Sequence, residues 1–310
     1  MKIYPFLSPL VLAVVFYLPI PFSHASCIGV VTAGGGAGFW REVQQGAQQA
    51  AKDLGIKVIV RGPIDEANSK GQGSVIKSVI TWGCKGLVLA PNSPDRKKEV
   101  KALKEKGIPT VYIDRDIGGA RVSVIKTQNY QAGILAGIQM SKALNGKGRI
   151  VLLRMSKDVI TTTHRENGFI KGAEGGGLEI ISEDFIGTTI GKARKKAQKI
   201  LSSIEAIDGI FTPNESTTLS TIKALQKLPH LSHILHIGFD AHDIIIESLL
   251  NKKMHGFITQ KPFLMGYKGV ATAHEAMQGK VVQRLINTDT VFINGENIRL
   301  KAIKTLLGID

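Results

Sequence analysis

Short apolar runs alternate with longer amphipathic stretches along most of this chain. The short runs are typical of parallel strands that helices cover on both faces, and the longer stretches are typical of the covering helices. The pattern therefore predicts an α/β fold. The expected strands are residues 28–32, 57–61, 86–90, 110–113, 122–125, 149–154, 179–185, 207–211, 234–238, 256–259 and 291–293.

The first amphipathic stretch illustrates the helical signal. Val43, Ala47, Ala50 and Leu54 recur at helical spacing, which places them on one face of a helix. Gly55 follows directly, and glycine readily takes the left-handed conformation that ends a helix. The sequence thus predicts both the helix and its end.

The strands divide into two groups of about five, each the size of a doubly wound parallel-sheet lobe. The expected segments are an N-terminal lobe of residues 26–127 with 260–288 and a C-terminal lobe of residues 128–259 with 289–310. No serine- or proline-rich linker separates the groups. We therefore expect a three-segment hinge of short ordered crossings near residues 126–129, 258–260 and 287–291. Such a hinge allows the lobes to close around a ligand.

Residues 1–25 have the composition of a signal peptide. Lys2 is followed by an apolar run at residues 11–17 and by the small-x-small triplet that ends at Ala25, where we expect cleavage. Prolines flank the apolar run on both sides, and the run is shorter than the roughly 20 residues that a membrane-spanning helix needs. The mature protein is therefore expected to be exported.

The chain is strongly basic, with 40 Lys and Arg against 25 Asp and Glu. Much of the excess lies in runs such as residues 96–98 and 192–199, on the polar faces of predicted helices. A solvated surface is the ordinary explanation of such runs. Since no nucleic-acid-binding motif accompanies the charge, we expect no nucleic-acid partner.

Two cysteines in an exported protein raise the question of a disulfide. Cys27 precedes the first predicted strand and Cys84 the third. In a sheet ordered 2-1-3-4-5 these strands are neighbours, so a bridge at their amino ends is geometrically feasible. Two buried free thiols are the alternative, and the sequence leaves both open.

Polar and aromatic residues gather where predicted strands end or helices open. In open α/β sheets ligands bind beyond the carboxyl ends of the strands, so side chains far apart in the sequence are expected to converge on one crevice. The candidates are Phe39, Trp40, Asp114, Arg115, Arg165, Asn214, Asp240 and Gln260.

These residue types suit a neutral ligand with many hydroxyls. Carboxylates accept from hydroxyls, guanidiniums donate to them, amides do both, and aromatic rings stack on the C–H face of a sugar. Each position has a simpler explanation: Phe39 and Trp40 suit a core, and Asp114 with Arg115 suits a local ion pair. Together, however, the eight residues could satisfy every hydroxyl of a buried polyol.

Six segments carry a resemblance to a known family. GFWREVQQGAQQAAKDLGI, VYIDR, RENGFIKG, IFTPNESTTLSTIKAL, IGFDAHD and ITQKPFLMGYKGV resemble, in that order, the periplasmic sugar-binding proteins of the ribose-binding type, components of ABC importers. The resemblance implies the type I periplasmic binding protein fold and a monomer that delivers a captured carbohydrate to a membrane permease. It implies no catalysis and no cofactor. It assigns ligand binding to the same eight residues and adds Phe185 as a further candidate for stacking.

The chain also departs from the family. Ribose binders place an asparagine just before the aromatic pair, whereas this chain has Ala37 and Gly38. One polar contact is therefore missing or replaced, and the ligand need not be ribose. The basic surface leaves an acidic or phosphorylated sugar open.

Other functions fit less well. A nicotinamide-dependent oxidoreductase would use the glycine loop after the first strand, but the G-x-G-x-x-G spacing from Gly34 requires glycine at position 39, where Phe39 stands. A hydrolase would pair Asp114 with Asp240, although carboxylates on a sugar equally serve hydrogen bonding. His230, His233 and His236 run from a loop into a strand and would point apart, so no metal site is expected. A sensor that presents its ligand to a membrane kinase remains an alternative.

Overall fold

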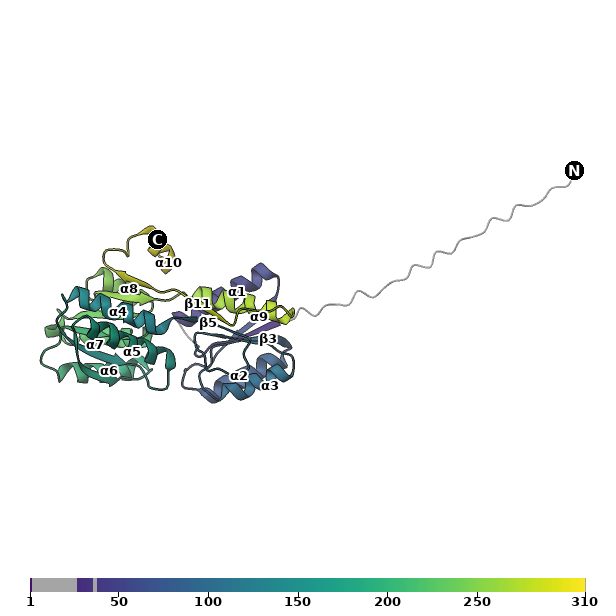
Figure 1. The fold of residues 1–310 in the computed structure, drawn as a ribbon, viewed down its shortest axis with the longest axis horizontal. Coiled ribbons are helices and arrows are strands. Elements are labelled where there is room, and N and C mark those ends of the chain that lie inside the picture. The colour runs from purple at the N-terminus through teal and green to yellow at the C-terminus, as the bar shows by residue number, and fades with distance from the viewer. Residues whose placement is uncertain (2–26, 36–37, 310) are drawn as a thin grey trace.

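The structure, a computed structural model, describes Met1, residues 27–35 and residues 38–309. These residues form two α/β lobes that lie side by side, each built on a six-stranded sheet (Figure 1). Apart from Met1, the predicted signal peptide lies outside the described residues. Among the described helices, none is both long and apolar enough to cross a bilayer.

The N-terminal lobe has the sheet order β11-β5-β4-β3-β1-β2. Its strands are β1 (Cys27–Val31), β2 (Lys57–Arg61), β3 (Cys84–Leu89), β4 (Thr110–Ile113), β5 (Ser123–Thr127) and β11 (Leu285–Thr288). Its helices are α1 (Phe39–Leu54), α2 (Ser69–Thr81), α3 (Arg96–Glu105) and α9 (Pro262–Met277). Side chains of α1 and α9 pack on one face of the sheet, and those of α2 and α3 pack on the other.

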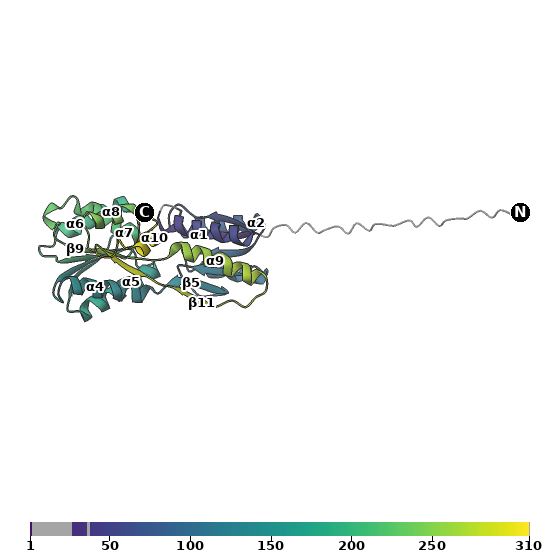
Figure 2. The same cartoon turned by 90° about the horizontal axis from the view of Figure 1, so that it is seen from above.

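The C-terminal lobe repeats this topology in the order β7-β6-β8-β9-β10-β12. Its strands are β6 (Arg149–Arg154), β7 (Glu179–Phe185), β8 (Gly209–Phe211), β9 (Leu235–Phe239), β10 (Gly256–Thr259) and β12 (Val291–Asn294). Its helices are α4 (Asn129–Ala143), α5 (Ile160–Gly175), α6 (Ile190–Ser202), α7 (Glu215–Leu225), α8 (Asp243–Leu250) and α10 (Lys301–Leu307), with a 3₁₀ turn at Pro229–Leu231. α4 and α5 cover one face, and α6 and α7 cover the other (Figure 2).

Each of the eleven predicted strands is present with ends within two residues, and the predicted order 2-1-3-4-5 is confirmed in the N-terminal sheet. The sequence did not predict β11, which pairs with β5 at the sheet edge. An edge strand is covered less completely, so Leu285 can stay exposed and no continuous apolar run is needed. Three crossings connect the lobes, between β5 and α4, between β10 and α9, and between β11 and β12. Each is only a few residues long, as the absence of a linker indicated.

Cys27 and Cys84 form a disulfide in the structure, at the amino ends of the neighbouring strands β1 and β3. The bridge spans a sequence separation of 57 residues. Because it restricts the unfolded chain over that length, it stabilises the N-terminal lobe chiefly through the unfolded state.

Replacing both Cys27 and Cys84 by alanine should lower the free energy of unfolding by about 2 to 4 kcal/mol. Denaturant titration of the purified protein measures this loss. Reductant should destabilise the natural protein to the level of the variant and leave the variant unchanged. An effect of reductant on the variant would show that the loss has another cause.

Helices α4 and α5 approach each other through glycines. A Cβ added to Gly133 in α4 would lie 2.0 Å from the carbonyl oxygen of Arg165, and one added to Gly168 in α5 would lie 2.1 Å from that of Tyr130. Only residues without a side chain allow the backbones this close. The contact positions the part of α5 that carries Arg165.

The substitution Gly133→Ala should therefore destabilise the protein by about 1 to 3 kcal/mol, because the helices must move apart. Gly175→Ala is the matched control, since no atom lies within 4 Å of its added Cβ. That change should be neutral or stabilise by up to about 1 kcal/mol. Urea denaturation of both variants compares the two, and equal stabilities would contradict the packing argument.

Candidate ligand-binding cleft

A cleft of about 330 Å³ lies between the lobes, beyond the carboxyl ends of strands from both sheets. This volume is near the lower end of the range for small-molecule sites. All eight residues of the convergent set predicted from strand ends line it: Phe39, Trp40, Asp114, Arg115, Arg165, Asn214, Asp240 and Gln260. The structure thus brings together side chains that lie as far as 221 positions apart in the sequence, from Phe39 to Gln260.

Asp114 and Asp240 occupy equivalent places in the two lobes. Asp114 directly follows β4, Asp240 directly follows β9, and each of these strands is the fourth of its lobe. Both aspartates have a positive φ, 62° and 70° respectively, which is uncommon outside glycine. Such backbone strain persists where the surrounding structure enforces it, often at binding sites. Each lobe therefore uses the same turn to present a carboxylate to the cleft.

On the N-terminal side, Arg115 joins two carboxylates. Its Nε donates to Asp114 Oδ2 at 3.1 Å, and its Nη2 forms an ion pair and hydrogen bond with Glu66. The other Glu66 oxygen accepts from the indole N–H of Trp40 at 2.8 Å. Burial disfavours the Glu66 carboxylate, but the charge and hydrogen bond of Arg115 and the bond from Trp40 outweigh it, so the pKa of Glu66 is lowered. Burial dominates at Asp114, whose pKa is raised.

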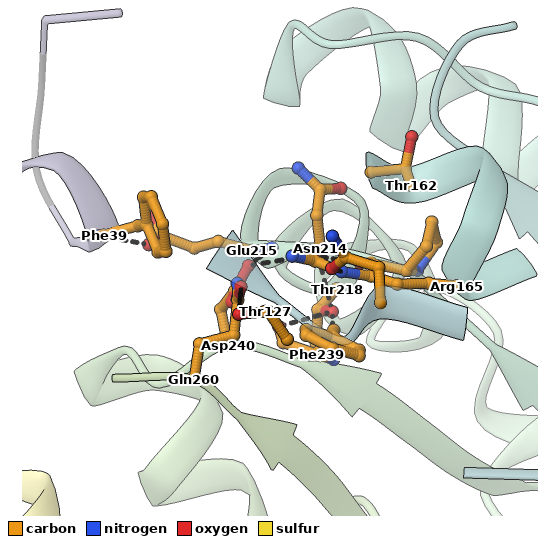
Figure 3. Close-up of polar contacts among 12 residues, drawn as sticks. Phe39, Thr127, Thr162, Arg165, Asn214, Glu215, Thr218, Phe239, Asp240 and Gln260 are labelled. Carbon is orange, nitrogen blue, oxygen red and sulfur yellow. Dashed lines mark hydrogen bonds and ion pairs between the residues drawn. The ribbon is translucent and has the colours of Figure 1, made fainter. Parts of the chain in front are cut away.

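On the C-terminal side, Arg165 is almost fully buried one turn inside α5, whereas the sequence suggested that it opens this helix. Its Nε donates to Asn129 Oδ1 at 2.8 Å and its Nη1 donates to the carbonyl of Pro213 at 3.0 Å. Nη1 also lies 3.9 Å from Asp240 Oδ2, and the guanidinium lies 4.0 Å from the centroid of the Phe239 ring. Figure 3 shows Arg165 together with Phe239 and Asp240. These contacts hold the Arg165 guanidinium in one orientation.

Asp240 connects the cleft to the hinge. Gln260, in the crossing between β10 and α9, donates its amide to Asp240 Oδ1 at 2.5 Å and accepts from Thr127 Oγ1 at 2.7 Å. Thr127 Oγ1 also lies 3.4 Å from the hydroxyl of Thr288, so all three crossings meet here. Burial is the main cause that raises the pKa of Asp240.

Phe39, Trp40 and Asn214 also stabilise the fold. Phe39 and Trp40 pack edge to face with centroids 4.8 Å apart, and Trp40 belongs to the buried core as well as to the cleft wall. Asn214 caps α7, since its side-chain oxygen accepts from the backbone N–H of Thr217 at 3.2 Å. The structural and the ligand-facing interpretations of these residues are therefore compatible.

Comparison with known proteins places the chain in a family. Residues 28–281 match the periplasmic binding protein domain. The chain belongs to the periplasmic binding protein family. The ribose import binding protein of Haemophilus influenzae is 25% identical over 259 residues, which cover 83% of this chain and 87% of that protein. The D-apiose import binding protein of Paraburkholderia graminis is 26% identical over 275 residues, which cover 86% and 87% of the two chains.

The solved structure of an ABC-type sugar transport system periplasmic component from Hahella chejuensis is 29% identical. It superimposes with a TM-score of 0.81 and covers 86% of this chain and 99% of its own. The similarity therefore extends over both lobes of this periplasmic binding protein.

Phe185, the further candidate for stacking from the second lobe, is not among the residues that line the cleft. Phe185 ends the edge strand β7 outside the cleft, with 36% of its surface exposed and the Arg154 guanidinium 4.9 Å from its ring centroid. Thr188 and Thr189 line that side of the cleft instead. The following loop, and not the strand end, reaches the ligand space.

The structure also adds cleft residues that sequence reasoning missed. Glu66 lies in the loop after β2, and Glu215 directly follows Asn214, so the rule of strand ends could have suggested both. The other additions are Ile64, Asp65, Met155, Val159, Thr161, Thr162, Thr188, Thr189 and Ser216. With them, the cleft has more carboxylates than guanidiniums, although the whole chain carries a formal charge of +15.

The substitution Glu66→Gln tests the ion pair with Arg115. The lowered pKa of Glu66 means that its contribution is fully present above its ordinary pKa of 4.5 and is lost as the pH falls through the lower folded value. The variant should therefore lose roughly 1 to 3 kcal/mol of stability at pH 7, and the difference from the natural protein should narrow at pH 3. Urea denaturation at both pH values measures it.

Glu105→Gln is the control for this experiment. Glu105 is exposed and lies 4.0 Å from Lys101, and surface pairs of this kind contribute within about 1 kcal/mol. If Glu66→Gln costs no more than the control at pH 7, the buried ion pair does not stabilise the cleft.

Proposed function

We propose that this protein captures a monosaccharide or a related polyol between its lobes and delivers it to the membrane permease of an ABC importer. The observation that carries the proposal is the convergence of the eight polar and aromatic side chains predicted from the sequence on one cleft between the lobes. In this proposal the predicted signal peptide of residues 1–25 is cleaved near Ala25. The mature protein then works as a periplasmic monomer.

The cleft chemistry supports a polyhydroxylated ligand. Asp114 and Asp240 offer carboxylate oxygens from opposite lobes, and Arg115 and Arg165 offer forked donors beside them. A sugar hydroxyl both donates and accepts, so a neighbouring carboxylate and guanidinium can satisfy it together. Phe39 supplies a half-exposed ring at the same site for the apolar face of the sugar.

The charge of the cleft favours a neutral ligand over an acidic or phosphorylated one. Asp65, Glu66, Asp114, Glu215 and Asp240 line the cleft, against the guanidiniums Arg115 and Arg165. An anionic ligand that is enclosed there would be repelled, at low dielectric, by those of the five carboxyl groups that are ionised. The basic residues of this chain lie mainly on exposed helix faces such as those of α3 and α6, away from the cleft lining.

The hinge and the relatives support capture and delivery. Three short crossings permit the lobes to close around a ligand, and Gln260 links Asp240 in the cleft to Thr127 in the hinge. The similar proteins of Haemophilus influenzae and Paraburkholderia graminis import ribose and D-apiose. The identities to this chain are only 25% and 26%. We therefore infer for this protein the class of ligand that these relatives bind, but not the individual sugar.

Screening by thermal shift and calorimetry tests the proposal. Pentoses, hexoses, inositols, amino sugars and sugar acids are added to the purified mature protein. A ligand at a hundred times its Kd should stabilise the protein by about 2.7 kcal/mol, and the sugar should be recovered intact. The proposal fails if no compound in these classes raises the melting temperature.

A matched pair of substitutions tests the position of the ligand. Phe39→Leu should weaken binding roughly three- to tenfold, because a stacking ring is lost. Phe185→Leu is the same change outside the cleft and should leave Kd unchanged. Calorimetry with the best sugar from the screen measures both. A larger effect of Phe185→Leu would place the ligand elsewhere.

A further inference from the structure

Helix α1 begins without a capping side chain from its own lobe. Its N-cap residue is Gly38, which has no side chain and a φ of 66°. The first backbone N–H groups of a helix have no partner within the helix, and together they form a partially positive end that favours an acceptor or an anion. The start of α1 lies at the cleft, because Phe39 and Trp40 line it.

Glu215, from the other lobe, supplies the missing acceptor. Its Oε2 accepts from the backbone N–H of Phe39 at 3.1 Å, across a sequence separation of 176 residues. A Cβ added to Gly38 would lie 1.9 Å from the same oxygen, so the carboxylate occupies the space that any other residue at position 38 would fill. Figure 3 shows Phe39 and Glu215 approaching each other from separate elements.

The backbone of Glu215 is itself fixed in the cleft. Its N–H donates to Asp240 Oδ2 at 2.9 Å, and Asn214 before it caps α7. Burial, followed by the nearby Asp240 carboxylate, raises the pKa of Glu215 to about 7, although the Phe39 N–H opposes this shift. Glu42 and Arg41 in the first turns of α1 are the other charged neighbours. The carboxyl group is therefore partly shielded from water where it contacts the start of α1.

Among the described residues, the hydrogen bond between Phe39 and Glu215 is the one that joins the two lobes outside the hinge. Because α1 and α7 belong to different lobes, an opening motion that separates these helices would break the contact. It joins protein groups directly at the border of the cleft.

We propose that Glu215 is a positioning residue that holds the lobes closed over the ligand by capping α1 of the opposite lobe. This inference rests on the proposed function for its role in binding, whereas the cap itself is a hydrogen bond between two groups of the protein. The cap raises the population of the closed, binding-competent form, which lowers the apparent Kd in proportion. It also adds a steric reason for glycine at position 38, where the φ of 66° already favours this residue.

The first test needs no ligand. Amide hydrogen exchange at Phe39, followed by NMR, should be roughly three- to tenfold faster in Glu215→Ala than in the natural protein, because the acceptor is gone. Glu215→Gln keeps an acceptor oxygen and should restore protection. Asp243→Asn, a change in the first turn of the neighbouring helix α8, is the control and should leave Phe39 unchanged. Unaltered exchange in Glu215→Ala overturns the cap, and melting curves show that each variant is folded.

The second test uses the best sugar from the screen. Glu215→Ala should raise the dissociation rate three- to tenfold with the association rate little changed, and Glu215→Gln should stay close to the natural protein. Gly38→Ala should weaken binding in the natural background and weaken it less in the Glu215→Ala background, because the steric conflict then disappears. Additive effects of the two substitutions overturn the proposal. If no sugar binds to the natural protein, the proposed function fails while the exchange experiment still decides the cap.

Discussion

The carboxylate of Asp240 joins the parts of the molecule on which binding depends. One of its oxygens accepts from Gln260 in the hinge, and the other accepts from the backbone of Glu215 and lies near Arg165. A buried carboxylate is costly unless each oxygen has partners. Because these partners come from the hinge, from α7 and from α5, satisfying one carboxylate fixes the relative positions of all three.

The two lobes hold their cleft arginines in different ways. In the N-terminal lobe, Arg115 is balanced by Asp114 and Glu66, so that side of the cleft is a closed ion-pair network with local partners. In the C-terminal lobe, Arg165 is held by neutral groups on Asn129 and Pro213 and lies 3.9 Å from Asp240. The Nη2 group of Arg165, which has no hydrogen-bond partner among the described residues, thus keeps hydrogen-bonding capacity at the cleft lining. A hydroxylated ligand that meets both lobes can use it.

Much of the fold followed from local patterns. Strands such as Thr110–Ile113 and Gly256–Thr259 were predicted with the bounds that they have, because burial on both faces requires continuous apolar residues. The strand Leu285–Thr288 escaped prediction because a strand at the edge of a sheet does not meet that requirement. The cleft residues at strand ends were also recognisable, since parallel strands deliver their carboxyl ends to one side of a sheet.

The sequence by itself determined which segments become strands and helices and which polar residues follow the strand ends, because these properties depend on neighbours in the chain. Only the tertiary structure decided that Phe185 lies outside the cleft lining, that Cys27 meets Cys84, and that Glu66 pairs with Arg115. It also decided that Glu215 reaches α1 across 176 positions. Such partners depend on the packing of whole elements and lobes, and the identity of a residue does not specify which distant group its side chain will contact.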